Sequence, residues 1–176
     1  MKQAIGISVH TGWGACVVVG GTLARPEIVA NEVIQILTDP ERFCFHRAEE
    51  MARDAAERWI ASLRVRALAN ARAALTPLLA KGAETCAIVA KNGEMPSLGE
   101  ILASHPRMHT CEGFFYRDVL REACAIPTHV VPPTSLDVSK VGKLAAAPWG
   151  RDQKLAALAA WSVIEKGRSS RAANTG

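Results

Sequence analysis

Apolar and polar residues alternate from the start of the chain, which predicts an N-terminal β-strand. Ile5, Ile7 and Val9 fall on one face of that strand, and Ser8 and His10 fall on the other. After a short Thr-Gly breaker, residues 13–19 form a β-branched run that ends in two glycines. The two runs together predict an antiparallel hairpin. Residues 27–37 continue as a third strand, whose polar positions suit an exposed sheet edge.

The pattern changes to a helical one from about residue 48 to residue 80. Gly is absent there and good helix formers dominate, which predicts one long helix or two helices in series. Between residues 58 and 83 the segment has five basic residues and no acidic one. Two interpretations follow: a stripe that faces phosphate, or cations favoured near the C-terminal end of a helix by its macrodipole.

The second half of the chain alternates strands and helices. Residues 85–90 form a short apolar run typical of a strand buried in a parallel sheet, and residues 127–131 form another. Helices are expected at 97–103, 106–124 and 151–165, with a short helix around 135–145. We expect residues 167–176 to form a disordered tail.

This order predicts an α/β fold of the type β-β-β-α-β-α-β-α, with one mixed five-stranded sheet flanked by helices in a single domain, residues 1–166. The first strand would lie centrally, between an antiparallel partner and a parallel one. A ligand crevice is then expected beyond its C-terminal end, where His10 lies.

Composition narrows the class of protein. The 176 residues are 49% hydrophobic, yet no apolar run approaches the roughly 20 residues of a membrane-spanning helix. The start shows no leader pattern, so a cytoplasmic protein is expected. Five cysteines without a CxxC spacing suggest buried free thiols rather than disulfides or a zinc finger. The net charge of +4 permits an anionic partner such as a nucleic acid, and the Ala-rich helices and exposed third strand leave room for a homodimer.

Familiar catalytic loops are missing from the sequence. It has no GxSxG nucleophile elbow, no GxxxxGK[ST] phosphate loop and no GxGxxG fingerprint. The sequence therefore gives no support to a serine hydrolase, a P-loop protein or a dinucleotide-binding enzyme.

A candidate site combines His10 with the start of the last helix. His10 follows the first strand, and Asp152 and Lys154 begin a helix that should start near the same sheet edge. A neutral imidazole can act as a general base near pH 7 or ligate a metal, and Asp152 could orient it or complete a metal shell. In the alternative, His10 is a turn residue and Asp152 is a carboxylate stabilised by the first turn of a helix.

A second cluster of candidates lies on the helix at 106–124. His109 and Glu112 share a helix face and His105 lies one turn earlier, which suggests a metal site or an ordinary solvated face. Tyr116 would extend that face as a small-ligand or base-stacking surface, unless the neighbouring aromatic residues anchor the helix to the core. His46 precedes two glutamates and is interpreted as a base beside acids or as the start of the long helix.

The opening segments Gly6-Ile7-Ser8 and Thr11-Gly12-Trp13-Gly14, with the order of elements, resemble the ribonuclease H-like superfamily and, within it, the Holliday-junction resolvase type. The segments HTGW, HPRMHTCEGFFYRDVL and APWGRDQKLAALAAW also look like those of an uncharacterised bacterial group of that superfamily.

This resemblance implies a two-metal nuclease, in which carboxylates from the first strand, the fourth strand and the last helix hold a divalent metal, Mg²⁺ or Mn²⁺. The first position falls on Ser8 here, and the end of the fourth strand offers Ala90 and Lys91. Asp152 remains at the last position. Glu94 could replace the fourth-strand ligand if the preceding turn folds it back.

Two hypotheses therefore stand. One is a nucleic-acid-binding or regulatory domain of ribonuclease H-like fold that lacks the standard carboxylate set. The alternative is a metal-dependent nuclease with an altered active site around His10 and Asp152, supported by Glu112 or Glu94 and, as a further metal ligand, His109.

Overall fold

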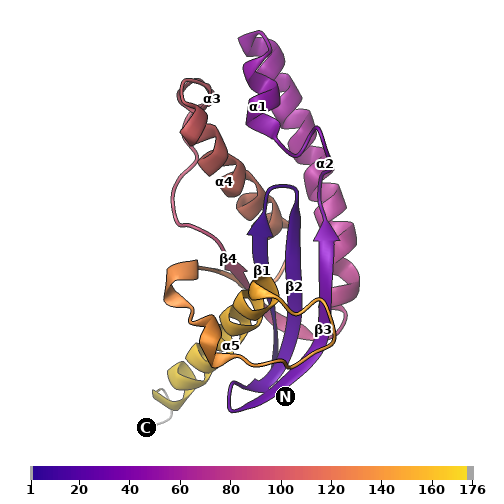
Figure 1. Cartoon of the computed structure of the whole chain (residues 1–176), viewed down its shortest axis with the longest axis vertical. Coiled ribbons are helices and arrows are strands. Elements are labelled where there is room, and N and C mark those ends of the chain that lie inside the picture. Colours follow the sequence, from indigo (N-terminus) through magenta and orange to yellow (C-terminus); the bar gives the residue numbers. More distant parts are fainter. Residues whose placement is uncertain (1, 174–176) are drawn as a thin grey trace.

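A five-stranded mixed sheet forms the centre of the molecule (Figure 1). The structure is a computed structural model that describes residues 2–173, without the side chains of 167–173. The order across the sheet is β3-β2-β1-β4-β5, with β1, β2 and β3 antiparallel and β4 and β5 parallel to β1. The strands span Gln3–His10, Trp13–Thr22, Arg25–Gln35, Ala83–Val89 and Thr128–Val131. The predicted mixed sheet, with its central first strand and its edge third strand, is confirmed.

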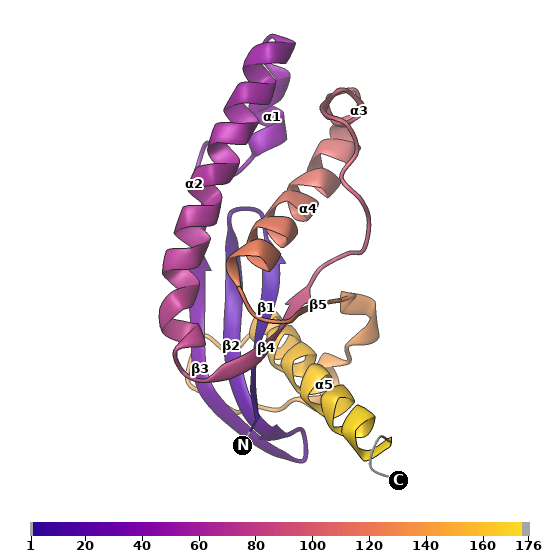
Figure 2. The same cartoon turned by 180° about the vertical axis from the view of Figure 1, so that it is seen from behind.

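Helices cover both faces of the sheet (Figures 1 and 2). One face carries α1 to α4, and the other carries α5. Two short 3-10 turns, Pro133–Ser135 and Val138–Lys140, lie in the connection before α5. The helices span Cys44–Glu49, Arg53–Leu79, Leu98–Leu102, His105–Ala123 and Arg151–Ala173. None of them, over the described residues, has the length and apolar character needed to cross a bilayer.

The alternation in β1 divides the core into two layers. Ile5 and Ile7 are fully buried beneath α1 to α4, whereas Ala4 is buried beneath α5. Gly6 permits an unusually close approach of α5, because a Cβ atom at this position would lie 1.8 Å from the Ala156 carbonyl oxygen. The buried indole of Trp161 donates to the Gly20 carbonyl at 3.0 Å and ties α5 to β2. These contacts fix where α5 begins relative to the end of β1.

Two sequence expectations about the helices need correction. The cations of α2 do not gather in its last turn, as the macrodipole interpretation requires, and three of them pair instead with acidic side chains from other elements. Arg66 binds Glu41, and Arg64 and Arg72 approach Glu122. The last helix includes residues 167–173, which were expected to be disordered, because extending a formed helix costs far less than nucleating one. The remaining part of the expected tail, residues 174–176, lies outside the described residues.

Candidate functional site

A cavity of about 360 Å³ opens at the C-terminal ends of β1 and β4. The walls come from the ends of these two strands, the loop after β4, one face of α4 and the first turn of α5. This is the edge of the sheet where the order of strands predicts a ligand crevice. The polar lining residues are Ser8, His10, Lys91, His109, Thr110, Arg151 and Asp152.

His10 and Asp152 both line this cavity and lie against each other. Nε2 of His10 lies 2.9 Å from Oδ1 of Asp152, although the ring nitrogen is not aligned for a hydrogen bond to that oxygen. The buried Ser8 hydroxyl donates to the same Asp152 oxygen at 3.2 Å. The His10 ring also stacks on Trp13, with ring centroids 4.1 Å apart and planes 6° apart. Strand pairing and stacking therefore hold the imidazole against the carboxylate, as the sequence analysis expected.

The first turn of α5 sets the position of Asp152. Gln153 is buried, and its side-chain oxygen accepts a hydrogen bond from the Gly150 backbone N–H at 3.0 Å. The carboxylate of Asp152 lies in the turn whose backbone N–H groups have no partner within the helix, and these groups favour a negative charge. Lys154 is two positions farther along, which is more than half a helical turn, and it does not line the cavity. The expectation that Lys154 joins His10 and Asp152 in one pocket is wrong.

The loop after β4 is held by a buried arginine. Arg117 of α4 donates to the backbone oxygens of Lys91 and Gly93, at 3.1 and 2.9 Å, and lies over the Phe114 ring. Gly93 has φ of +150°, and a Cβ atom there would lie 2.5 Å from that ring. This turn leaves Lys91 at the cavity and carries Glu94 into a separate depression beside Arg117. Glu94 is therefore not a substitute for the missing carboxylate of the fourth strand.

Two further candidates occupy other places than expected. Glu112 does not line the cavity; it is fully buried, with Oε1 2.7 Å from Nδ1 of His46. Tyr116 is fully buried and donates its hydroxyl to the Arg42 carbonyl at 2.7 Å, so it offers no stacking surface. Phe114, which lines the cavity, is the aromatic residue in reach of a ligand.

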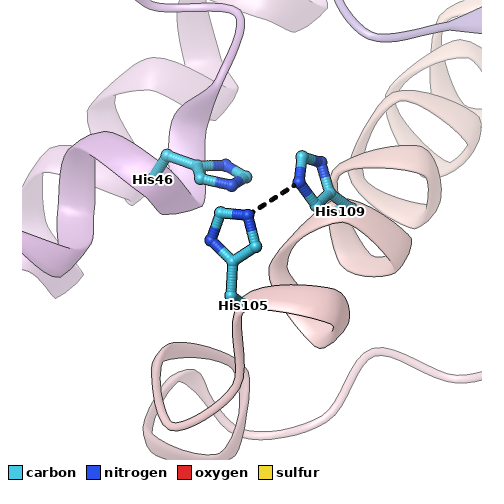
Figure 3. Close-up of side chains that lie close together, drawn as sticks. All are labelled: His46, His105 and His109. Atoms are coloured by element: carbon cyan, nitrogen blue, oxygen red, sulfur yellow. Dashed lines mark hydrogen bonds between the residues drawn. The ribbon is translucent and has the colours of Figure 1, made fainter.

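Three histidines converge beside the cavity (Figure 3). His105 and His109 project from the first turns of α4, and His46 reaches them from α1. His109 lines both the cavity and a second depression that contains His46 and His105. The sequence analysis grouped His105 and His109 with Glu112 and placed His46 beside the glutamates that follow it. No sequence pattern around His46 or Glu112 predicts their contact, because the two residues lie far apart in the chain.

Burial and the charge of Glu112 act on the groups around this cluster. Burial chiefly, and then the nearby carboxylate of Glu112, raises the pKa of the Cys44 thiol. The pKa of Tyr116 is also raised, first by burial and then by Cys44 and Glu112. Both groups therefore stay protonated and neutral near pH 7.

Comparisons with known proteins give a likeness in structure. No family model matches the sequence, and no curated protein matches it. The fold is similar to that of Thermus thermophilus RuvC in complex with Holliday junction substrate, with a TM-score of 0.60, 12% sequence identity and 96% of each chain covered. It is also similar to a second Thermus thermophilus RuvC structure, with a TM-score of 0.51 and 15% identity over 96% of this chain and 97% of that one. At such low identity these likenesses show a shared fold.

Proposed function

Proceeding from a chain with the ribonuclease H-like fold, we propose that the cavity between β1, β4, α4 and α5 binds the phosphodiester backbone of a nucleic acid. Lys91 and Arg151 bring two permanent positive charges to the cavity from two different elements. The histidines His10 and His109 add donors for phosphate oxygens. Asp152, which is the one carboxylate among the described lining residues, is already close to His10.

The shortage of carboxylates is the observation that carries this proposal. A pair of Mg²⁺ or Mn²⁺ ions needs several hard oxygen ligands. Here Ser8 brings a neutral hydroxyl at the end of the first strand, Lys91 brings a cation beyond the fourth, and Glu94 and Glu112 point elsewhere. The residues present do not fit a two-metal centre. They suit a bound anion better.

A branched DNA is the first ligand to try. The likeness to a resolvase fold seen with a Holliday junction supports that choice. The Phe114 ring at the cavity wall would offer a stacking face for an unpaired base.

The test measures binding of a fluorescent four-way junction, a duplex and a single strand to the whole chain over a range of salt concentrations. We expect affinity to fall as salt rises. Lys91→Gln should weaken binding several-fold and lower the salt slope by about 1. Lys81 gives a matched control: it is an exposed lysine that precedes β4, whereas Lys91 follows the same strand. Equal losses in Lys81→Gln and Lys91→Gln, or binding that ignores salt, would refute the proposal.

A second candidate function, cleavage of the bound strand, is favoured by one observation. His10 lines the cavity with its Nε2 2.9 Å from Asp152, so its other ring nitrogen can take a proton from an attacking hydroxyl while the carboxylate stabilises the imidazolium. Assays with DNA, RNA and junction substrates, with and without Mg²⁺ or Mn²⁺, decide this. Cleavage that is lost in both His10→Gln and Asp152→Asn supports it, and intact substrates throughout exclude it.

A further inference from the structure

The second depression shares His109 with the first cavity and is lined by three histidines. His46 comes from α1, and His105 and His109 lie one turn apart on α4 (Figure 3). Their ring centroids are 4.5 to 4.9 Å apart in every pairing. One nitrogen from each ring can be chosen so that all three lie within 4.8 Å of one another.

The spacing of these nitrogens matches a metal centre. Zinc binds imidazole at about 2.0 to 2.1 Å in a tetrahedron, which places neighbouring ligand nitrogens about 3.3 Å apart. Nε2 of His105 and Nε2 of His109 are already 3.1 Å apart. A nitrogen of the third ring, His46, lies within 4.8 Å of the other two, so this ring would have to move closer to complete the face of a tetrahedron.

Glu112 supplies the carboxylate that usually accepts a hydrogen bond from a metal-binding histidine. Its Oε1 lies 2.7 Å from Nδ1 of His46, which fixes the proton on Nδ1 and leaves the lone pair of Nε2 for an ion. The residue is 0% exposed, and its second oxygen, Oε2, has no hydrogen-bond partner among the described residues. A buried carboxylate in that state is costly unless positive charge lies near. A divalent cation on His46 would supply it.

The remaining side of the cluster faces solvent. His105 and His109 are exposed and His46 is half-buried. The two carboxylates that line this depression, those of Asp39 and Glu50, are paired with Arg42 and Arg47 at 2.8 and 3.0 Å. The fourth coordination position is therefore left to water, as in zinc sites that keep an open position.

We propose that His46, His105 and His109 bind one Zn²⁺ ion, with Glu112 as the carboxylate that orients His46. Nitrogen donors favour zinc and its neighbours in the transition series over Mg²⁺. The site shares His109 with the nucleic-acid cavity, but its other two donors, His46 and His105, lie outside that cavity. The two proposals can fail separately because the test of the zinc site contains no nucleic acid.

The experiment titrates ZnCl₂ into the whole chain, prepared without a histidine tag and stripped with a chelator, and follows heat release and melting temperature. Co²⁺ replaces Zn²⁺ in a parallel titration that records the visible absorption of a tetrahedral site. We expect one equivalent of metal, a higher melting temperature with zinc, and tetrahedral cobalt bands. His105→Gln and His109→Gln should abolish all three results, and both side chains are exposed, so these variants keep the fold.

Two further variants sharpen the result. Glu112→Gln should weaken zinc binding by about 10- to 100-fold while the stoichiometry stays at one, as expected for a carboxylate that acts through its histidine. His129→Gln, which removes an exposed histidine on β5, should bind zinc as the parent does. A parent protein without a zinc equivalent, or His105→Gln and His109→Gln variants that bind as tightly as the parent, overturns the proposal.

Discussion

Adding one methyl group at Gly6 tests the contact that positions α5 against β1 beside the cavity. Gly6 lies in the middle of β1, at the place where the backbone of α5 crosses the strand. A Cβ atom in Gly6→Ala would lie 1.8 Å from the Ala156 carbonyl oxygen and 2.5 Å from its carbon. Ordinary contact begins at 3.4 Å, so the nearest pair is 1.6 Å too close and backbone must move.

The cost of that movement can be bounded. Overpacking a core costs about 1 to 3 kcal/mol of unfolding free energy, and more where only backbone can give way. For a chain of this size each kcal/mol lowers the melting temperature by about 2 to 4 °C. Because the clash at Gly6 is with backbone, the upper figure of about 3 kcal/mol applies, and we expect Gly6→Ala to melt about 6 to 12 °C lower than the parent, or lower still. A shift of α5 would also move Arg151 away from its place in the cavity, so binding of a nucleic acid there should weaken although no charged lining side chain is altered.

A matched control adds the same methyl group where it meets nothing. Gly113 lies inside α4, and a Cβ atom there would have no neighbour within 4 Å. Alanine is the better helix former, so Gly113→Ala should raise stability by roughly 0.5 to 1 kcal/mol. Thermal unfolding of both variants is followed by circular dichroism. The added methyl group should lower the melting temperature in Gly6→Ala and raise it in Gly113→Ala. An unchanged melting temperature in Gly6→Ala would refute the argument that this glycine sets the position of α5.

Three more predictions concern charge. Asp152→Asn removes a negative charge that repels phosphate from the cavity, so it should tighten binding of a DNA junction several-fold at low salt. Weaker binding of the fluorescent junction, measured by fluorescence anisotropy, would contradict this. Burial raises the pKa of the Cys16 and Cys44 thiols above their ordinary value of 9.0, so both stay protonated in the folded protein. Below pH 9 these thiols should not affect the free energy of unfolding. Above pH 9 the unfolded chain loses these protons and the folded protein keeps them, so the free energy of unfolding should fall by about 1.4 kcal/mol per pH unit for each thiol. Denaturant titrations from pH 7 to about 11 check the sign, and a flat profile rejects it. Arg117→Met removes the donors that hold the loop after β4, and should make that loop exchange its amide hydrogens faster while the amides of β1 exchange as before.

The parts of the fold that follow from local pattern could be predicted from sequence. Alternation in β1 and the continuous apolar run of β4 specify strands on their own, and chain order then makes β1 central. The meeting of His10 with Asp152 followed from that topology, because the end of β1 and the start of α5 share one edge of the sheet.

The errors concern contacts between residues that lie far apart in the chain. Glu94 lies in a separate depression because Arg117, on α4, fixes the turn that precedes it. Glu112 belongs to His46 because α1 and α4 pack together, and neither segment carries a sign of the other. Side-chain direction at such places depends on tertiary packing, which spacing along one element does not encode.

His109 borders both hollows of the molecule. Binding of the two proposed ligands would then be thermodynamically linked, since the His109 rotamer that one ligand selects is the rotamer presented to the other. Linkage is reciprocal: the factor by which a cation beside His46 changes the dissociation constant of a polyanion equals the factor by which that polyanion changes the dissociation constant of the cation.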